Sequence, residues 1–349
     1  MNFISKQFDF KKSEKTILIG EIGVNHNGDK KLLFDLIDQG ILSGIDILKF
    51  QRFKSEEEIS IFAESADYQK NANQGDSQLE LAKKLELPDE WLLEVFDYCK
   101  KKKVGFLCTA FDFSSVDFIA DELKCSSIKV PSPEITNIPL LEYIADRFEG
   151  VILSSGASNL SETIRASKIF NRNELVVMHC LSEYPAPINE INLNCMKTLE
   201  DSLDCPIGYS DHTEGVIAPI VASSMGAVVI EKHYTLDKSM EGPDHSASAS
   251  IEEINEIVFN LKTIHASKGS YEKEVAPSEK KNQSLIRKSI TCAHKFLEPG
   301  TKISEDMLSY KRPVAEGSIE PFDFKKILGK KLRKEKRFDE PFFWSDFNS

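Results

Sequence analysis

The sequence predicts an α/β protein in which a (β/α)8 (TIM) barrel is followed by a small β-rich domain. Eight short apolar runs alternate with eight amphipathic segments over the first three quarters of the chain. Strands that alternate with helices predict a parallel sheet, and eight such units in about 250 residues fit a closed barrel better than an open doubly wound sheet. Polar side chains also gather at the same end of run after run. After Ser267 the alternation stops, which indicates a second domain.

The expected strands are the short apolar runs, because runs of this length joined by helix-length segments are typical of buried parallel strands. They lie at Thr16–Ile22, Asp46–Phe50, Val104–Thr109, Ser127–Val130, Gly150–Ser154, Glu174–His179, Pro206–Tyr209 and Ala227–Ile230. The expected helices lie at Lys30–Leu42, Asp89–Lys102, Ser114–Leu123, Ile138–Asp146, Leu160–Phe170, Leu193–Leu203, Gly215–Ser224 and Ile251–Ser267. Start signals such as Pro88-Asp89 support several of these helices.

Two segments interrupt the alternation. The insertion Lys54–Leu87 is longer than an ordinary strand-to-helix loop, so it is either a lid over a substrate site or a structural excursion over the rim. Residues 268–284 form a polar connector after a barrel domain at 1–267. Residues 285–349 are expected to form the β-rich domain, with strand-like pieces at Ser289–Cys292 and Met307–Tyr310.

Composition excludes several classes of protein. The contents of 41% hydrophobic and 29% charged residues are ordinary for a soluble globular chain, and no apolar run approaches the roughly 18 residues of a membrane helix. The N-terminal stretch lacks the apolar core of a signal peptide, and the seven cysteines form no CxxC pair, which together predict a cytoplasmic protein. A net charge of -12 argues against nucleic acid as a partner, but a local basic pocket can still bind an anionic substrate.

The polar strand ends predict one shared mouth. Functional groups at the carboxyl ends of parallel strands converge. The candidate groups there are Glu21, Lys49, Gln51, Thr109, Lys129, Ser132, Glu134, Ser154, Ser182, Tyr184 and Ser210. Lys49 and Lys129 lie inside apolar strands, where an unpaired charge is costly, so we expect an anion or a carboxylate to meet each of them.

Two histidines follow equivalent strands. Ser210-Asp211-His212 and Glu231-Lys232-His233 end the last two runs, with Asp244 nearby in sequence. His212 and His233 are expected to face each other, with Glu231 and Asp244 nearby. Two neutral imidazoles with carboxylates and water suit Mn, Fe or Zn. The alternative is a pair of histidines satisfied within the core.

The inventory of the mouth indicates a class of chemistry. Lysines with several serine hydroxyls suit a phosphate or carboxylate, and a divalent metal can polarise a carbonyl. Glu134, near a lysine, can act as a general acid or base. These groups predict carbon–carbon bond formation or isomerisation on a phosphorylated or sugar substrate.

Ten segments resemble the sialic acid synthase family, which includes N-acetylneuraminate, legionaminate and pseudaminate synthases. They are, in order, IGEIGVNHNGD, LKFQRFK, FLCTAFD, IKVPSPEITNIPLL, VILSSG, HCLSEYPAP, IGYSDHTEG, VIEKHYTLD, EGPDHSAS and KRPVAEG. The resemblance covers nearly the whole chain from about Thr16, and the C-terminal part resembles the family's antifreeze-like (SAF) domain. It implies condensation of phosphoenolpyruvate with an N-acylated six-carbon amino-sugar aldehyde, of the N-acetylmannosamine type, to a nine-carbon 2-keto acid and phosphate.

The resemblance also implies roles for individual residues. His212 and His233 would hold a divalent metal, most often Mn2+, with Mg2+ or Co2+ as alternatives. The phosphoenolpyruvate site would use Lys129, Ser132, Ser154 and Ser210. The sugar side and its support would use Glu21, Lys49, Gln51, Asn73, Thr109, Ser182, Tyr184 and Asp244. Glu134 would be the central acid/base, with Glu21 also catalytic, and Arg312 would reach the partner's active site in a domain-swapped homodimer.

The sequence departs from the family pattern at three places. Pro133 stands where glycine is common, Ser154-Ser155-Gly156-Ala157 replaces Ser-Thr-Gly-Met, and Ser182 stands where some members have asparagine. None of these changes removes a titratable group, so a working enzyme is expected.

Three alternatives to a sialic or legionaminic acid synthase stay open. They are a pseudaminate synthase, a catalytically impaired sugar-binding homologue, and a generic metal-dependent barrel aldolase. Tyr68-Gln69 and Glu183-Tyr184-Pro185 resemble the neuraminate and legionaminate branches more than the pseudaminate one. The SAF-like tail with Arg312 argues against the aldolase.

Overall fold

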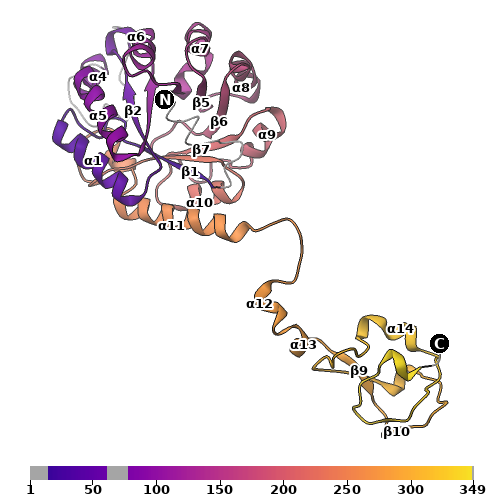
Figure 1. The fold of residues 1–349 in the computed structure, drawn as a ribbon. Helices are drawn as coiled ribbons and strands as arrows, with labels where there is room; N and C mark the ends of the chain where they lie inside the picture. Colours follow the sequence, from indigo (N-terminus) through magenta and orange to yellow (C-terminus); the bar gives the residue numbers. More distant parts are fainter. Residues whose placement is uncertain (1–14, 61–77, 348–349) are drawn as a thin grey trace. The chain divides into compact units, whose positions relative to one another are not determined.

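The structure, a computed structural model, describes residues 15–60 and 78–347 of the chain. The chain divides into two compact units, Met1–Gly269 and Ser270–Ser349 (Figure 1). The predicted sugar contact Asn73 and the pair Tyr68-Gln69 lie outside the described residues.

The first unit is a closed barrel of parallel strands that pair in sequence order, β1 to β8, with β8 returning to β1. The strands are β1 (Ile17–Glu21), β2 (Ile47–Arg52), β3 (Gly105–Ala110), β4 (Ser127–Val130), β5 (Gly150–Ser154), β6 (Glu174–Cys180), β7 (Ile207–Asp211) and β8 (Val229–His233). The predicted fold class is therefore confirmed. β8 closes the barrel in the register Ile17↔Val229 to Glu21↔His233, which fixes the ends of the first and last strands side by side.

Helices surround the barrel (Figure 1). The longer ones are α1 (Lys30–Ser43), α4 (Gln78–Leu85), α5 (Asp89–Lys102), α7 (Ile138–Ala145), α8 (Leu160–Ser167), α9 (Cys195–Ser202), α10 (Ile217–Ser224) and α11 (Ile251–Lys268). Shorter pieces are α2 (Ser55–Glu58) and α6 (Phe113–Asp117). N-terminal capping residues fix where several helices begin. Asp29 caps α1, and Asn159 and Ser250 form capping boxes at α8 and α11.

Side chains of the strands form two apolar layers because they alternate between the faces of the sheet. Inside the barrel lies a small cluster of Ile17, Ile19, Ile47, Leu107, Ile152, Val176, Met178 and Val229. A larger cluster packs the outer strand faces against the helices and includes Phe50, Tyr209, Ile230 and Tyr234. The inner cluster fills the barrel toward the amino ends of the strands. The carboxyl ends are left to the polar residues described below.

The second unit is built from short antiparallel pairs around its own core. β9 (Ser289–Cys292) pairs with β11 (Leu308–Lys311), and β10 (Phe296–Leu297) pairs with β12 (Lys336–Arg337). Ile290, Ile303, Ile319 and Phe342 are fully or almost fully buried there. The helices of this unit are α12 (Pro277–Lys280), α13 (Gln283–Ile286) and α14 (Phe324–Ile327). The β-rich character expected for this part of the chain is confirmed.

Three local features differ from the sequence expectation. The last two barrel strands continue through their polar clusters, because Ser210 pairs with Glu231 and Asp211 with Lys232 in the ladder. The helix expected at Ser114–Leu123 is split into α6 and a π-helical turn, Phe118–Glu122. The helix expected at Leu193–Leu203 begins at Cys195.

Among the described residues, no helix is both long and apolar enough to span a membrane.

Candidate active site

The polar residues of the mouth occupy the same inward face that carries the inner apolar cluster. Two residues beyond Ile19, Ile47 and Leu107 come Glu21, Lys49 and Thr109, and two beyond Ile152 and Val229 come Ser154 and Glu231. Because side chains alternate along a strand, these groups must point into the barrel once the apolar ones do. The alternation that builds the core therefore also collects the functional groups at its carboxyl end.

Two lysines and two carboxylates form the centre of this cluster. Lys49 Nζ lies 2.9 Å from Glu21 Oε1 and 3.5 Å from Glu231 Oε1. Lys129 Nζ lies 3.7 Å from Glu231 Oε2. All four side chains are at most 5% exposed. The expectation that an anion meets each buried lysine is confirmed, and Glu231 is the anion that Lys49 and Lys129 share.

Burial and charge act against each other in these groups. Burial lowers the pKa of Lys129 and raises that of Glu21. For Glu231, burial is outweighed by Lys129 and Lys49, so its pKa falls below the usual range. For Lys49, burial is likewise outweighed by Glu21 and Glu231, and its pKa rises. Glu231 is therefore ionised at neutral pH, and of the two ammonium groups that of Lys129 gives up its proton more easily.

Hydroxyl and amide groups line the same cluster. Lys129 Nζ donates to Ser154 Oγ at 2.7 Å, and Lys49 Nζ donates to Thr109 Oγ1 at 3.0 Å. Ser210 Oγ donates to Glu231 Oε1 at 3.1 Å. Gln51 Nε2 donates to Glu21 Oε1 at 2.6 Å. The predicted residues Glu21, Lys49, Gln51, Thr109, Lys129, Ser154 and Ser210 thus form one connected network with Glu231.

Ser132 and Ser182 meet at a glycine. The backbone N–H of Gly156 donates to Ser132 Oγ at 2.9 Å. A side chain at position 156 would collide with the hydroxyl groups of both Ser132 and Ser182. Gly156 is therefore required by the close approach of these two serines, which come from the loops after β4 and β6.

The two histidines face each other at the ends of β7 and β8. The ring centroids of His212 and His233 are 5.7 Å apart. The Nδ1 of His212 lies 2.7 Å from the carbonyl oxygen of Leu181, which assigns the proton to Nδ1 and leaves a lone pair on Nε2. That Nε2 lies 2.9 Å from the hydroxyl of Tyr184, which can donate to it. The alternative of two histidines satisfied by the core is not supported for His233, whose buried Nδ1 has no hydrogen-bond partner among the residues that the structure describes.

The donor set fits a divalent metal. His233 Nδ1 lies 3.6 Å from Asp244 Oδ2, and a second orphaned acceptor, Glu231 Oε2, is buried nearby in the cluster. Burial lowers the pKa of His233 to about 4, so its imidazole is neutral and able to ligate at neutral pH. Within residues 15–60 and 78–347, no three His, Cys, Asp or Glu side chains are already gathered as a metal cluster. The two imidazoles would therefore need water or substrate oxygen as further ligands.

Glu134 lies in a short 3-10 turn, Ser132–Thr136, that directly follows β4. Asn137 Nδ2 donates to Glu134 Oε2 at 2.6 Å, while burial and the charge of Asp112 raise the pKa of Glu134. A carboxyl group with a raised pKa suits proton transfer near neutral pH. Pro133 precedes it without disturbing the turn, since Glu134 N still donates to Pro131 O at 3.1 Å.

Arg312 belongs to the second unit, where it follows β11 and forms a cis peptide bond with Pro313. Its predicted approach to the partner's active site stays a prediction.

The sequence placed Glu231 near the two histidines but did not predict its contact with the two lysines, Lys49 and Lys129. Its signal was available: an acidic residue on the inward face of a strand, two positions after the apolar Val229. The predicted strand ended at Ile230, which hid the alternation that points the Glu231 side chain into the barrel beside the lysines.

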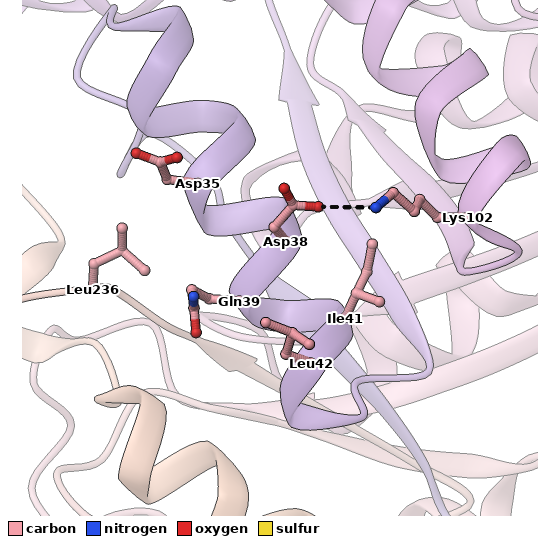
Figure 2. Close-up of a pocket in the computed structure, with 7 residues that line it drawn as sticks. All are labelled: Asp35, Asp38, Gln39, Ile41, Leu42, Lys102 and Leu236. Carbon is pink, nitrogen blue, oxygen red and sulfur yellow. Dashed lines mark ion pairs between the residues drawn. The ribbon is translucent and has the colours of Figure 1, made fainter.

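A surface pocket lies elsewhere on the barrel, on the outer face of α1 (Figure 2). It is lined by Asp35, Asp38, Gln39, Ile41, Leu42, Lys102 and Leu236. Its charges are already paired: Lys31 Nζ lies 2.6 Å from Asp35 Oδ2, and Lys102 Nζ lies 3.6 Å from Asp38 Oδ1. This pocket contains none of the predicted site residues, and its charged groups are satisfied without a ligand.

Comparison with known proteins identifies the family of each unit. The model of the NeuB family matches residues 36–273, and that of the SAF domain matches residues 293–348. The N,N'-diacetyllegionaminic acid synthase of Campylobacter jejuni is 41% identical over 94% of this chain and 98% of its own length. The enzyme of the same name from Legionella pneumophila is 39% identical over 90% of each chain.

Two further comparisons bear on the branch and on the fold. The pseudaminic acid synthase of Helicobacter pylori is more distant, at 28% identity over 93% of this chain and 95% of its own. The crystal structure of N-acetylneuraminic acid synthetase from Leptospira borgpetersenii superposes with a TM-score of 0.70 at 32% identity, covering 77% of this chain and 91% of that one.

Proposed function

This chain belongs to the NeuB family, and we propose that it condenses phosphoenolpyruvate with an N-acylated amino-sugar aldehyde. The products are a nine-carbon 2-keto sugar acid and inorganic phosphate, and the reaction is a transferase reaction. Because phosphoenolpyruvate is a cytoplasmic metabolite, we place the reaction in the cytoplasm.

One observation carries this proposal: a buried lysine pair and a histidine pair share a single barrel mouth. Lys49 and Lys129 lie around Glu231, and Glu231 belongs to the same strand as His233. An anion site directly beside a metal-competent site suits a reaction between an anionic three-carbon donor and a carbonyl acceptor.

The anionic donor would bind at the lysines. Lys129 with Ser154, and Lys49 with Thr109, offer charged and neutral donors to the phosphate and carboxylate of phosphoenolpyruvate. Ser132 and Ser210 add hydroxyls on the loop after β4 and on β7. Glu231 compensates the charge of Lys129, while Lys49 is also paired with Glu21.

The aldehyde acceptor would bind at the histidines. His212 and His233 would hold a divalent metal, Mn2+ in our proposal with Mg2+ or Co2+ as alternatives, and when bound it would polarise the aldehyde carbonyl. The carbonyl of Leu181 holds the Nδ1 of His212 and orients its ring. Asp244 lies beside His233, and the Tyr184 hydroxyl, which lies on the Nε2 of His212, would leave that atom to the metal. Glu21 and Gln51, joined by a hydrogen bond, would contact the sugar hydroxyls from the neighbouring strands β1 and β2.

The chemistry then needs one carbon–carbon bond and one carbon–oxygen cleavage. C3 of phosphoenolpyruvate attacks the aldehyde carbon, and water adds to C2. The tetrahedral intermediate loses phosphate with the bridging oxygen, which leaves a keto group at C2. Glu134 is positioned after β4 to take a proton from the water and to return one to the departing phosphate.

The acceptor is proposed to be a 2,4-diacetamido-2,4,6-trideoxyhexose of the manno type, which gives N,N'-diacetyllegionaminic acid. Support comes from the relatives of that name at 41% and 39% identity, against 28% for the pseudaminic acid synthase. Arg312 of the second unit is proposed to complete the sugar side of the partner's site in a domain-swapped homodimer.

Phosphate release from phosphoenolpyruvate in the presence of Mn2+ tests the proposal. We expect release that requires both sugar and metal, stops with chelator, and is faster with 2,4-diacetamido-2,4,6-trideoxymannose than with N-acetylmannosamine. Release with N-acetylmannosamine alone would assign the neuraminate branch. No release with either sugar, from folded and metal-loaded protein, would overturn the proposed reaction.

A further inference from the structure

A buried ion pair lies directly behind the two histidines. Lys232 Nζ is 2.6 Å from Asp211 Oδ2, and the exposures of the two side chains are 1% and 0%. Asp211 precedes His212 and Lys232 precedes His233 in the sequence. Since neighbouring residues of a strand point to opposite faces, the pair lies on the outer face of the sheet while the cluster lies inside.

The pair is the centre of a fully buried network. Asp211 Oδ1 accepts from Tyr209 Oη at 3.0 Å and from the backbone N–H of Thr213 at 3.0 Å. Asp211 Oδ2 accepts from Thr213 Oγ1 at 3.2 Å in addition to Lys232. Lys232 Nζ also donates to the carbonyl oxygen of Thr213. Each carboxylate oxygen thus has two donors.

This network connects the segment around His212 to the residue that precedes His233. Residues 211 and 213 flank His212, and both are bonded to Lys232, which is adjacent to His233. The ladder adds a backbone constraint, because Asp211 and Lys232 are register partners of β7 and β8. The separation of the two imidazoles is therefore linked to a single buried salt bridge.

Stability alone does not account for such a pair. Burying two charges removes their hydration, and well-packed apolar residues of similar volume are often equally stable or more stable. Tyr209 and Ile230 on the same outer face belong to the apolar cluster between barrel and helices. An ion pair in that apolar layer is better explained by the relative position of the two segments that it connects.

We propose that Lys232 and Asp211 are positioning residues that set the distance and orientation of His212 and His233 for binding a divalent metal. The inference rests on the metal site of the proposed function. It gives a structural role to two residues that would contact neither substrate nor metal. Partners that hold metal-binding histidines in place commonly contribute about 10- to 100-fold to metal affinity.

The test measures metal binding rather than turnover. Free Mn2+ is titrated by electron paramagnetic resonance against the full chain and three variants: Asp211→Asn, Lys232→Met and the double variant. Asp211→Asn keeps the shape and an acceptor for Thr213, so it provides a mild change should Lys232→Met fold poorly. Thermal unfolding of each protein is recorded in parallel.

A matched control is available in the second unit. Lys336 Nζ lies 2.7 Å from Asp346 Oδ2, and these side chains are 9% and 5% exposed, so this is another buried lysine–aspartate pair. Lys336→Met with Asp346→Asn removes the same chemical groups from a different unit. Its Mn2+ affinity should stay within about twofold of the wild type, because separate sites act independently.

We expect Lys232→Met and Asp211→Asn to weaken Mn2+ binding by about tenfold or more. The double variant should regain thermal stability relative to Lys232→Met, since no unpaired buried charge is left, while its Mn2+ affinity stays low. Affinity that is unchanged in the folded variants, or that recovers together with stability, would overturn the positioning role. Wild-type protein that binds no Mn2+ would overturn both this inference and the proposed metal site, whereas wild-type binding without phosphate release would count against the proposed reaction alone.

Discussion

At the scale of single residues, Glu231 decides the electrostatics of the mouth. It is the carboxylate that Lys49 and Lys129 share, at 3.5 and 3.7 Å. The two lysines draw its pKa below the usual range in spite of burial. In the proposed reaction, a phosphate arriving at the lysines would meet a site whose charge is already balanced, and Glu231 would set how strongly that phosphate is held.

Replacing Glu231 by Gln should destabilise the protein and make it respond to phosphate. Within the described part of the chain, Lys129 then keeps only the Ser154 hydroxyl as a hydrogen-bond partner. Loss of one member of a buried ion pair costs about 3 kcal/mol of unfolding free energy. Urea unfolding measures the loss, and added inorganic phosphate should restore more stability to the variant than to the wild type. Exposed Glu200→Gln serves as the control and should change stability by less than about 0.5 kcal/mol. Equal stability of the two variants would contradict the shared-carboxylate account.

His26 makes stability depend on acid. It is buried in the loop after β1, its Nδ1 accepts from the backbone N–H of Gly28 at 3.0 Å, and burial lowers its pKa from 6.5 to about 4. Below pH 6.5 the unfolded chain binds a proton there that the folded chain binds only near pH 4, so stability falls across that window. Above pH 6.5 the histidine is neutral in both states and contributes no pH dependence.

The variant His26→Asn tests this prediction, since the amide oxygen can take the place of Nδ1 as acceptor for Gly28. From neutral pH to pH 4, the unfolding free energy of the variant should fall by up to about 3 kcal/mol less than that of the wild type. His233 has its pKa lowered in the same direction and is retained in both proteins, so it does not affect the difference. Identical dependence of the unfolding free energy on pH in the variant and the wild type would contradict the prediction.

The sequence predicted partners for the buried lysines correctly. It did not predict contacts that depend on where the strands end. Lys49 and Lys129 lie inside apolar strands, which required anions that the structure supplies as Glu21 and Glu231. The network around Asp211 and Lys232 was not predicted, because the apolar runs were taken to end before these residues. Polar residues at a strand end can continue the ladder when their side chains find partners on either face.

At the scale of elements, the strand–loop junctions position the chemistry. β7 and β8 extend beyond the apolar runs because Ser210 pairs with Glu231 in the ladder and Ser210 Oγ bonds the Glu231 carboxylate. After β4, the 3-10 turn Ser132–Thr136 carries Ser132 and Glu134 in succession. Because the turn is short, the backbone conformation of Pro133 determines where the side chains of Ser132 and Glu134 lie.

Pro133 stabilises that turn rather than disabling it. It occupies the first turn of the 3-10 helix, where a free N–H has no intrahelical partner, so its missing N–H removes no bond. Pro133→Gly should lower the unfolding free energy by about 1 kcal/mol through the unfolded state and change kcat by less than about threefold. Urea unfolding and steady-state phosphate release measure the two quantities. A large gain of activity in the variant would show instead that Pro133 distorts the turn of Glu134.

The order and type of the barrel elements were predictable from alternation alone, because eight units leave few topologies. The details that failed are local. The π-helical turn Phe118–Glu122 and the shorter start of α9 at Cys195 depend on tertiary packing that periodicity does not contain. The part of the insertion that contains Asn73 lies outside the described residues.

At the scale of the whole molecule, the two units raise the question of how Arg312 would contribute. Each unit has its own core, and Arg312 follows a strand of the smaller one. In the proposed domain-swapped dimer, each active site combines a barrel from one chain with Arg312 from the other.

Mixing two inactive variants tests that arrangement. Arg312→Ala and His233→Ala should each be inactive alone, but one of the two sites in a mixed dimer has an intact barrel and an intact arginine. Random exchange of subunits would restore about a quarter of the wild-type sites. Phosphate release after verified exchange gives the answer, and a mixture as inactive as its components would contradict swapping.

The central claim is that the barrel mouth joins phosphoenolpyruvate to an aldehyde and releases phosphate by carbon–oxygen cleavage. The most direct measurement uses phosphoenolpyruvate labelled with 18O at the bridging oxygen, with 2,4-diacetamido-2,4,6-trideoxymannose and Mn2+. Phosphorus NMR then locates the label while mass spectrometry identifies the sugar product. Our account predicts the label in the released phosphate, in equal amount with a nine-carbon 2-keto acid. A label retained in pyruvate or in the keto group of the product would show phosphorus–oxygen cleavage and would contradict the account.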